Sequence, residues 1–174
     1  MDVLSDAKRV AVFIDLENVG PAGSYFPGRV KWMLREIRNT LELRHVEMQS
    51  PWAAINFESL WRLHDRNGYR ADLDAVFSEY NGFIQWTDLV ADDVIISQIN
   101  RRLKRGTLPD TVLLVTADND FTPIVERLRA FKKRVIVLHP EHTQKSRGLR
   151  ESADLTLSLD EFIDLPKLSP EPSS

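Results

Sequence analysis

The hydrophobic positions of this chain include three short, nearly continuous runs, which cover residues 9–14, 111–115 and 134–138. A strand whose successive residues are almost all apolar is typical of a sheet with both faces covered. The last two runs are separated by one helical pattern and short connections, which favours a parallel crossover. We therefore predict a buried parallel sheet with the first run near its centre.

Helical spacing of apolar residues marks three further stretches. The first runs from Pro27 to Leu41, with apolar residues three or four positions apart. The second covers Asp92–Leu103, begins with acids, ends with bases and stops at Gly106. The helix dipole prefers that order of charges. The third covers Thr122–Phe131.

Patterns in the middle of the chain are less regular. A short strand near residues 45–48 and a helix through Leu60 that ends before Gly68 are expected. Residues 69–77 alternate apolar and polar side chains, which predicts a half-buried strand. An irregular segment around Gly82 is expected to follow.

Alternating strands and helices over 174 residues predict one three-layer α/β/α domain with a mostly parallel central sheet. We place this domain at residues 1–165. Residues 166–174 contain three prolines and end in serines, so we expect a disordered tail there. Ligands of such folds bind outside the carboxyl ends of the strands.

Composition restricts the chemistry that these elements can carry. With no cysteine, the chain has no disulfide, thiolate metal site or cysteine nucleophile. An acidic start and the lack of a long apolar run predict a soluble, cytoplasmic protein that does not enter a membrane. The net charge of −3 disfavours a general nucleic-acid scaffold. Basic residues at 101–105, 127–134 and 145–150 form either a local basic surface or solvated helix ends.

Several carboxylates are predicted at one edge of the sheet. Asp15 and Asp118 each follow a buried strand, and parallel strands end at the same edge. Asp120 lies two residues beyond Asp118, and Asp92 or Asp93 opens a helix that enters from that edge. Carboxylates this close repel one another unless a cation bridges them, and oxygen ligands suit Mg²⁺ or Mn²⁺. Turn and cap roles are the structural alternative for Asp92, Asp93, Asp118 and Asp120.

Asp92 and Asp93 cannot both face one metal, because consecutive helical residues point about 100° apart. Asp92 lies near the middle of the apolar stripe that contains Ile95 and Ile99, whereas Asp93 lies at its border. A carboxylate within that stripe would be buried unless it precedes the helix as its N-cap. We therefore predict that Asp92 caps the helix and that Asp93 reaches the site, with Asp92 as the alternative ligand.

Other residues give little sign of a site. The four tryptophans are interpreted as packing residues, not as platforms for base stacking. The four histidines show no ligand spacing, and no glycine-rich phosphate loop is present. Asn18 either orients Asp15 or makes a local hydrogen bond.

Two motifs resemble those of NYN domains, which belong to the PIN-like group of metal-dependent ribonucleases. Phe13-Ile14-Asp15-Leu16-Glu17-Asn18 resembles the opening motif, and residues 116–125 resemble the second, with Asp118 and Asp120 in place. Residues 93–97 and 149–162 are similar to the middle acidic helix start and to the closing strand and short helix. The resemblance extends over residues 9 to about 165.

This resemblance implies hydrolysis of RNA phosphodiester bonds with Mg²⁺ or Mn²⁺. Asp15, Asp93, Asp118 and Asp120 would hold the metal directly or through water, while Asn18 and Thr116 would orient ligands. Basic residues would position the phosphates of single-stranded RNA with little sequence preference. These basic residues are Arg101, Lys104, Arg105 and Lys145.

Two alternatives of other classes stay open. In many NYN domains the middle helix carries a second acid six residues after the first. Counted from Asp93, that position is Ile99 in this chain. That difference and the acidic net charge favour a non-catalytic module that binds RNA or a protein partner. The pair Asp15 and Glu17 also resembles, distantly, the aspartate pair of phosphatases that form a covalent phosphoaspartate. The sequence leaves open whether the chain forms a homodimer.

Overall fold

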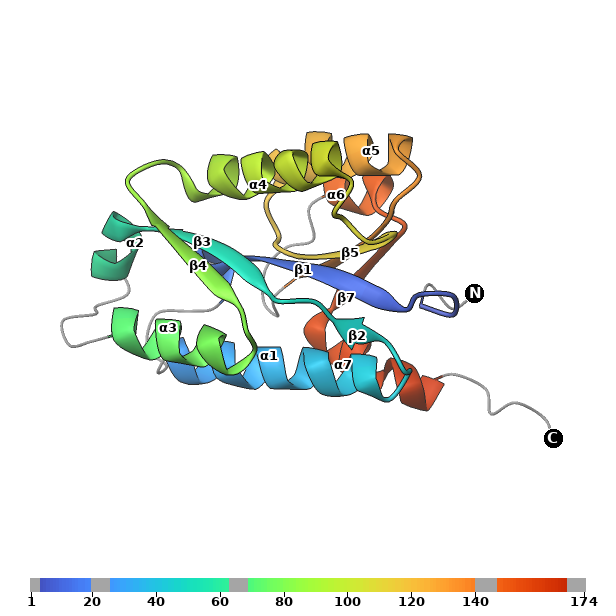
Figure 1. Cartoon of the computed structure of the whole chain (residues 1–174), viewed down its shortest axis with the longest axis horizontal. Coiled ribbons are helices and arrows are strands. Elements are labelled where there is room, and N and C mark those ends of the chain that lie inside the picture. The colour runs from blue at the N-terminus through green and yellow to red at the C-terminus, as the bar shows by residue number, and fades with distance from the viewer. Residues whose placement is uncertain (1–3, 20–25, 63–68, 140–146, 169–174) are drawn as a thin grey trace.

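The computed structural model describes residues 4–19, 26–62, 69–139 and 147–168 and contains one seven-stranded sheet between layers of helices (Figure 1). The strands are β1 (Arg9–Asp15), β2 (Glu47–Met48), β3 (Trp52–Asn56), β4 (Phe83–Thr87), β5 (Thr111–Val115), β6 (Arg134–His139) and β7 (Leu155–Ser158). The α-helices are α1 (Phe26–Glu42), α2 (Phe57–Arg62), α3 (Tyr69–Glu79), α4 (Ala91–Arg105), α5 (Thr122–Ala130), α6 (Arg147–Ser152) and α7 (Leu159–Leu168). Two short 3-10 helices are η1 (Leu16–Asn18) and η2 (Asn119–Phe121).

All paired strands in the described residues run parallel, in the order β4-β3-β1-β5-β6-β7, with β2 beside the start of β1. The predicted central position of the first strand is therefore confirmed. The chain passes from β1 to β3 and β4 on one side and then returns to β5 on the other. The strand order therefore reverses between β1 and β5, and ligands of open α/β sheets bind at the carboxyl ends of the strands at such a point.

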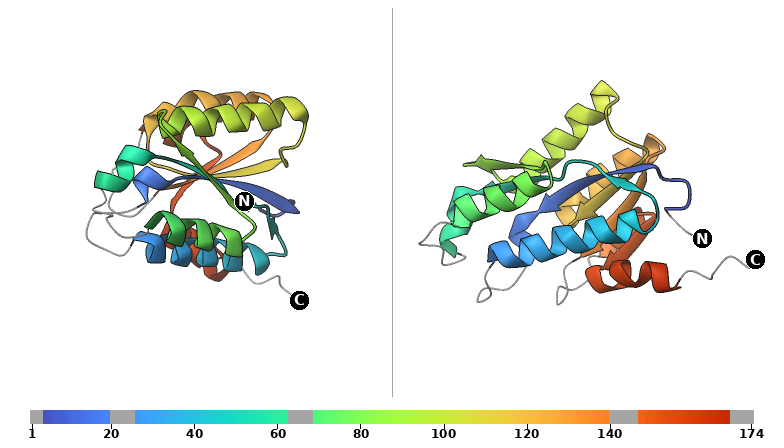
Figure 2. Two further views of the ribbon diagram at one scale, coloured as in Figure 1. Left: turned by 60° about the vertical axis from the view of Figure 1, so that its left-hand side comes forward. Right: turned by 60° about the horizontal axis from the view of Figure 1, so that its bottom comes forward.

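Each face of the sheet is covered by its own set of helices. Helices α4, α5 and α6 cover one face, and α1, α3 and α7 cover the other (Figures 1 and 2). Side chains alternate between the faces, so Val12 and Ile14 of β1 belong to the core on the α1 side. Ala11 and Phe13 belong to the core on the α4 side. Both faces are buried, as the continuous apolar runs predict.

The prediction of a strand over residues 69–77 is wrong, because these residues form most of helix α3. The buried side chains are Leu73, Val76 and Phe77, whose spacing of three and four residues is that of a helix. Strands β3 and β4 were not predicted. Ala53 and Ala54 of β3 have low strand propensity, and their burial comes from pairing with β1 and β4.

The C-terminal part differs from the prediction at its last helix. Helix α7 continues to Leu168, so the first three residues of the expected tail are helical. Residues 169–174 lie outside the described residues. Within the described residues, none of the helices combines the length and apolarity needed to cross a membrane.

Gly82 allows α3 and β4 to join in a tight turn. Asn81 adopts a positive φ of 54°, and the N–H of Gly82 donates to the carbonyl of Phe77 at 2.7 Å. A Cβ atom at Gly82 would lie 2.7 Å from the carbonyl oxygen of Pro51 and 2.8 Å from Pro51 Cγ. The turn is therefore closed against the segment that leads into β3.

We expect Gly82→Ala to lower the free energy of unfolding by about 1–3 kcal/mol, because the added methyl overlaps backbone. Gly106→Ala is the matched control. Gly106 has a φ of 68° but open space around it, so only backbone strain of about 1 kcal/mol is expected. Urea denaturation measures both, and a larger loss in Gly106→Ala would contradict the steric account.

Candidate metal centre

Asp15 lies at the carboxyl end of β1 and is fully buried. Its Oδ2 accepts a hydrogen bond of 3.0 Å from the Thr116 hydroxyl, which is also buried. The Thr116 hydroxyl in turn accepts a bond of 3.1 Å from the backbone N–H of Asp118. One hydroxyl therefore joins the end of β1 to the loop after β5.

Asp118 is half-buried and precedes η2 as its N-cap. Its Oδ1 accepts a bond of 2.9 Å from the backbone N–H of Asp120, which fixes the direction of the carboxylate. The Asp120 side chain is exposed and lies outside the acid cluster defined below. The structure therefore brings Asp118, but not Asp120, against Asp15.

Asp92 is the third carboxylate of the site. Helix α4 begins at Ala91 with Val90 as its N-cap, which places Asp92 in the first turn above the sheet edge. Asp15, Asp92 and Asp118 each offer one oxygen, and these three oxygens lie within 4.8 Å of one another. We call this group the acid cluster. Because all three ligands are carboxylate oxygens, it suits a hard divalent cation.

The predicted placement of Asp92 and Asp93 is wrong: Asp92, the alternative ligand, lies in the acid cluster, and Asp93 lies outside it. Asp92 does not cap α4, and it faces the site as the helical stripe alone would place it. Ala91, the first residue of the helix, is buried in the core on the α4 side, and Asp92 beside it lies against Asp15 and Asp118 at the sheet edge. Asp93 is exposed and lines a groove of about 300 Å³ on the other flank of α4, together with Trp52, Gln85 and Arg101.

The surroundings of Asp92 raise the cost of ionising its carboxyl. Burial raises the pKa of the Asp92 carboxyl to about 8, and the charge of Asp15 and a side-chain hydrogen bond with Asp118 contribute. The charges of Asp118 and Glu17 act in the same direction. Without a cation, Asp92 therefore holds a proton up to about pH 8 and shares it with Asp118.

Glu17, considered from the sequence only in the comparison with phosphatases, lies beside the cluster in η1. Its Oε1 accepts bonds from the backbone N–H of Asn56 at 3.2 Å and from the Ser59 hydroxyl at 2.6 Å. The Asn56 side chain donates to the carbonyl of Leu89 at 2.8 Å, just before α4. The opening motif that contains Asp15 also contains Glu17, and this was the available signal.

The remaining predicted residues are spread more widely. The side chain of Asn18 and all of Lys145 lie outside the described residues. Arg101 lines the groove beside Asp93, whereas Lys104 and Arg105 are exposed near the other end of α4. The helical rise places Arg105 about 20 Å along the axis from Asp92.

We expect the contribution of Asp92 to the stability of the metal-free protein to be lost as the pH rises from about 4 to about 8. The pKa of Asp92 is 3.8 in the unfolded chain and about 8 in the folded one. Between these values the folded state binds a proton that the unfolded state has lost, so raising the pH favours unfolding. Because the side chain is only half-buried, we expect about 1 kcal/mol, or ~2–4 °C in melting temperature.

Thermal unfolding in chelator at pH 5 and pH 8 measures this change. Asp92→Asn should reduce the fall in melting temperature between pH 5 and pH 8 by that ~2–4 °C. Asp93→Asn should show the same fall as wild type. If the melting temperatures of wild type and Asp92→Asn changed equally between pH 5 and pH 8, Asp92 would be ionised over that whole pH range.

Three comparisons with known proteins bear on these residues. The NYN domain family model matches residues 9–160, a range that contains the whole acid cluster. A search of curated proteins found no match. Among solved structures, the chain is similar to a protein of unknown function from Vibrio parahaemolyticus, with a TM-score of 0.62 and 18% identity, over 93% of this chain and 98% of that one.

That structural likeness concerns the fold alone at such low identity. The family model covers most of the chain and includes both motifs that surround Asp15 and Asp118. The chain belongs to the NYN domain family.

Proposed function

We propose that the acid cluster holds Mg²⁺ or Mn²⁺ and that the protein hydrolyses phosphodiester bonds of single-stranded RNA. The observation that carries this proposal is the approach of three carboxylates to within 4.8 Å at the carboxyl edge of the sheet. Membership of a family whose nucleases depend on metal and act on RNA supports it.

The donor set fits a hard divalent cation. The cluster offers oxygen ligands only, and a cation would replace the proton that Asp92 shares with Asp118. A bound divalent ion supplies polarisation of a phosphate oxygen and lowers the pKa of a water molecule. Thr116 and the N–H of Asp120 keep Asp15 and Asp118 in place for that role.

Hydrolysis forms one phosphorus–oxygen bond to water and breaks the bond to the leaving ribose oxygen. The water loses a proton and the leaving oxygen gains one, so no further reactant is needed. The N-terminal turn of α4 carries a partial positive charge and lies beside the cluster. It favours the negative charge that the phosphate brings to this edge.

The groove along α4 gives the strand a path away from the cluster. Asp93 and Arg101 line its α4 side, and Gln85 and Thr87 of β4 line the other. Arg101 lies about 13 Å along the helix from Asp92, so it contacts a phosphate some distance from the cleaved bond. Arg102 is engaged elsewhere, because its guanidinium donates to Gln49 Oε1 and to the Thr107 carbonyl at 2.8 and 2.9 Å.

A non-catalytic module is the second candidate, and one observation favours it. The position six residues after the helix acid is Ile99, fully buried in the core on the α4 side, when counted from Asp93, and Gln98 when counted from Asp92, so it contributes no acid in either case. The cluster would then bind the cation with three carboxylates, whereas many NYN domains have a fourth acid. Turnover of RNA decides between the two candidates.

We expect Mn²⁺-dependent cleavage of a generic single-stranded RNA, and we expect Asp92→Asn or Asp118→Asn to slow it by at least ~100-fold. Removing a group that stabilises charge at a reaction centre has an effect of this order. Asp110→Asn should stay within a few-fold of wild type, because its side chain is 98% exposed just before β5, at the opposite edge of the sheet from the acid cluster. Single-turnover cleavage with and without chelator measures the rates.

Calorimetric titration with Mn²⁺ separates the two candidates. If wild type binds Mn²⁺ through Asp118 but leaves RNA intact, the protein is a binding module. If wild type and Asp118→Asn give the same null signal at millimolar Mn²⁺, the metal site itself is refuted.

We expect RNA binding to be weak, insensitive to sequence and steeply dependent on salt, because phosphate contacts dominate it. Arg101→Gln should lower the slope of log affinity against log salt by about 0.7, the value for one contact to a single strand. Lys104→Gln removes the same charge outside the groove and serves as the control. Fluorescence anisotropy measures both, and equal slopes would place the strand elsewhere.

A further inference from the structure

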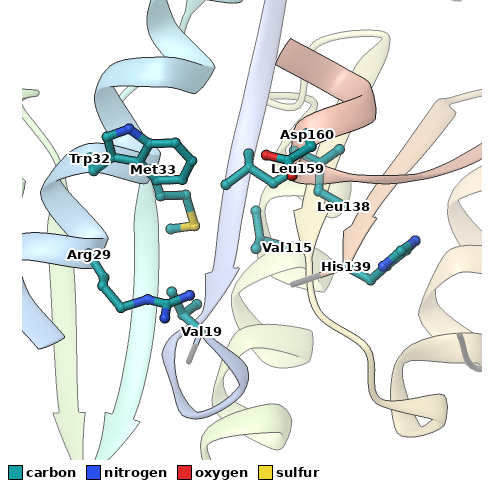
Figure 3. Close-up of a pocket in the computed structure, with 9 residues that line it drawn as sticks. All are labelled: Val19, Arg29, Trp32, Met33, Val115, Leu138, His139, Leu159 and Asp160. Carbon is teal, nitrogen blue, oxygen red and sulfur yellow. The ribbon is translucent and has the colours of Figure 1, made fainter. Parts of the chain in front are cut away.

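A small pocket opens at the carboxyl edge of the sheet on the face opposite the acid cluster (Figure 3). Its floor consists of Met33 of α1, Val115 of β5 and Leu138 of β6, which are all buried. Val115 belongs to the core on the α1 side, and Thr116, the next residue, bonds to Asp15 on the other side. The Cα atoms of these two residues are about 3.8 Å apart. The pocket and the acid cluster therefore share the end of one strand.

An aromatic ring and a cation stand at the mouth of the pocket. Trp32 is 41% exposed, and Figure 3 shows its indole beside Met33. Figure 3 also shows the Arg29 guanidinium extending toward Val19. In the part of the chain that the structure describes, Arg29 makes no ion pair or hydrogen bond. His139 and Asp160 complete the lining, so a guanidinium and a carboxylate both face the pocket. A nucleotide offers a partner to each, because its phosphate suits the guanidinium, its base presents N–H donors to a carboxylate, and its flat ring suits the indole.

The size of the pocket restricts what it accepts. Its cavity volume is about 50 Å³, which is room for roughly three to five water molecules. One ring fits this space, whereas a stacked pair of bases or a duplex does not. A base enters such a pocket only when it is unstacked and unpaired, as in single-stranded RNA.

We propose that this pocket binds one unpaired base of the RNA strand, next to the phosphate at the acid cluster. Trp32 and Met33 contact the ring, and Arg29 contacts the 5′-phosphate of the same nucleotide. The strand then crosses the sheet edge, with its phosphate on the α4 side and its base on the α1 side. This inference rests on the proposed function for the identity of its ligand, but binding at the pocket is measurable without cleavage.

Methionine methyl groups provide the readout. The chain has three methionines, and Met33 lies in the pocket floor whereas Met48 lies in β2, whose partner residues Arg9 and Val10 begin β1. With ¹³C-methyl methionine, titration of uridine or adenosine 5′-monophosphate in chelator should shift the Met33 signal and leave Met48 unchanged. Met33→Leu assigns the signal. Ribose 5-phosphate carries the same phosphate without a base and should bind at least about 5-fold more weakly.

Substitutions at the pocket mouth test the contacts. Trp32→Ala should weaken mononucleotide binding by about 5- to 100-fold, the range for loss of one stacked base, and Arg29→Gln should also weaken it. Phe131→Ala and Arg35→Gln change an exposed aromatic and an exposed guanidinium outside the pocket and should bind as wild type. An unchanged Met48 signal and melting temperature show that each variant is folded.

The outcomes separate this inference from the proposed function. If the Met33 signal responds to mononucleotides through Trp32 but RNA is not cleaved, the pocket stands and the nuclease proposal fails. If RNA is cleaved but Met33 does not respond at 10 mM mononucleotide, the base pocket is refuted. Equal binding of ribose 5-phosphate would also refute it, because the site would then recognise only an anion.

Discussion

The parallel pairing of β1 with β5 is the constraint on which the candidate site depends. Ile14 pairs with Val115 at the end of this ladder, so the next residues, Asp15 and Thr116, meet across the edge of the sheet. Their side chains bond at 3.0 Å. A shift of the register by one residue would turn one of them toward the opposite face. The apolar residues of β1 and β5, buried on both faces, hold that register.

The same pairing makes the edge electrostatically unfavourable in the absence of a cation. The carboxyl of Asp92 is half-buried beside Asp15 and Asp118, and burial together with the charges of Asp15, Asp118 and the exposed Glu17 raises its pKa. A fold selected only for stability would place neutral or opposite charges there. Thr116 and the backbone N–H of Asp120 instead hold Asp15 and Asp118 in their orientations. Carboxylates that are held close together in this way can bind a cation without first rearranging.

The sequence predicts the centre of the fold better than its margin. Buried parallel strands such as β1, β5 and β6 are continuous apolar runs, and α4 is amphipathic with charges that match its dipole, so both are visible in one sequence. Strands β3 and β4 depend on their neighbours for burial. Helix α3 buries only Leu73, Val76 and Phe77, and over residues 69–77 the spacing of its apolar residues fits either period. Local patterns do not contain that tertiary information.

The site was predictable where an acid follows a buried strand and less so where it lies on a helix. Asp15 and Asp118 are fixed by strand ends, whereas the choice between Asp92 and Asp93 depends on where α4 begins. With Val90 as its N-cap, α4 begins at Ala91, two residues earlier in the chain than it would with Asp92 as the cap. Ser, Thr, Asp and Asn are the preferred caps, so the sequence favoured the wrong start.

On the proposed function, metal and RNA must promote each other's binding. The acid cluster carries negative charge at neutral pH and opposes a phosphate, while Arg101 attracts the strand from a distance. A divalent cation removes that opposition and displaces the proton of Asp92. Thermodynamic linkage requires the reverse effect to be equal, so bound RNA raises the affinity for the cation by the same factor. A chain with an overall net charge of −3 can therefore bind a polyanion selectively at the one edge where the cation is held.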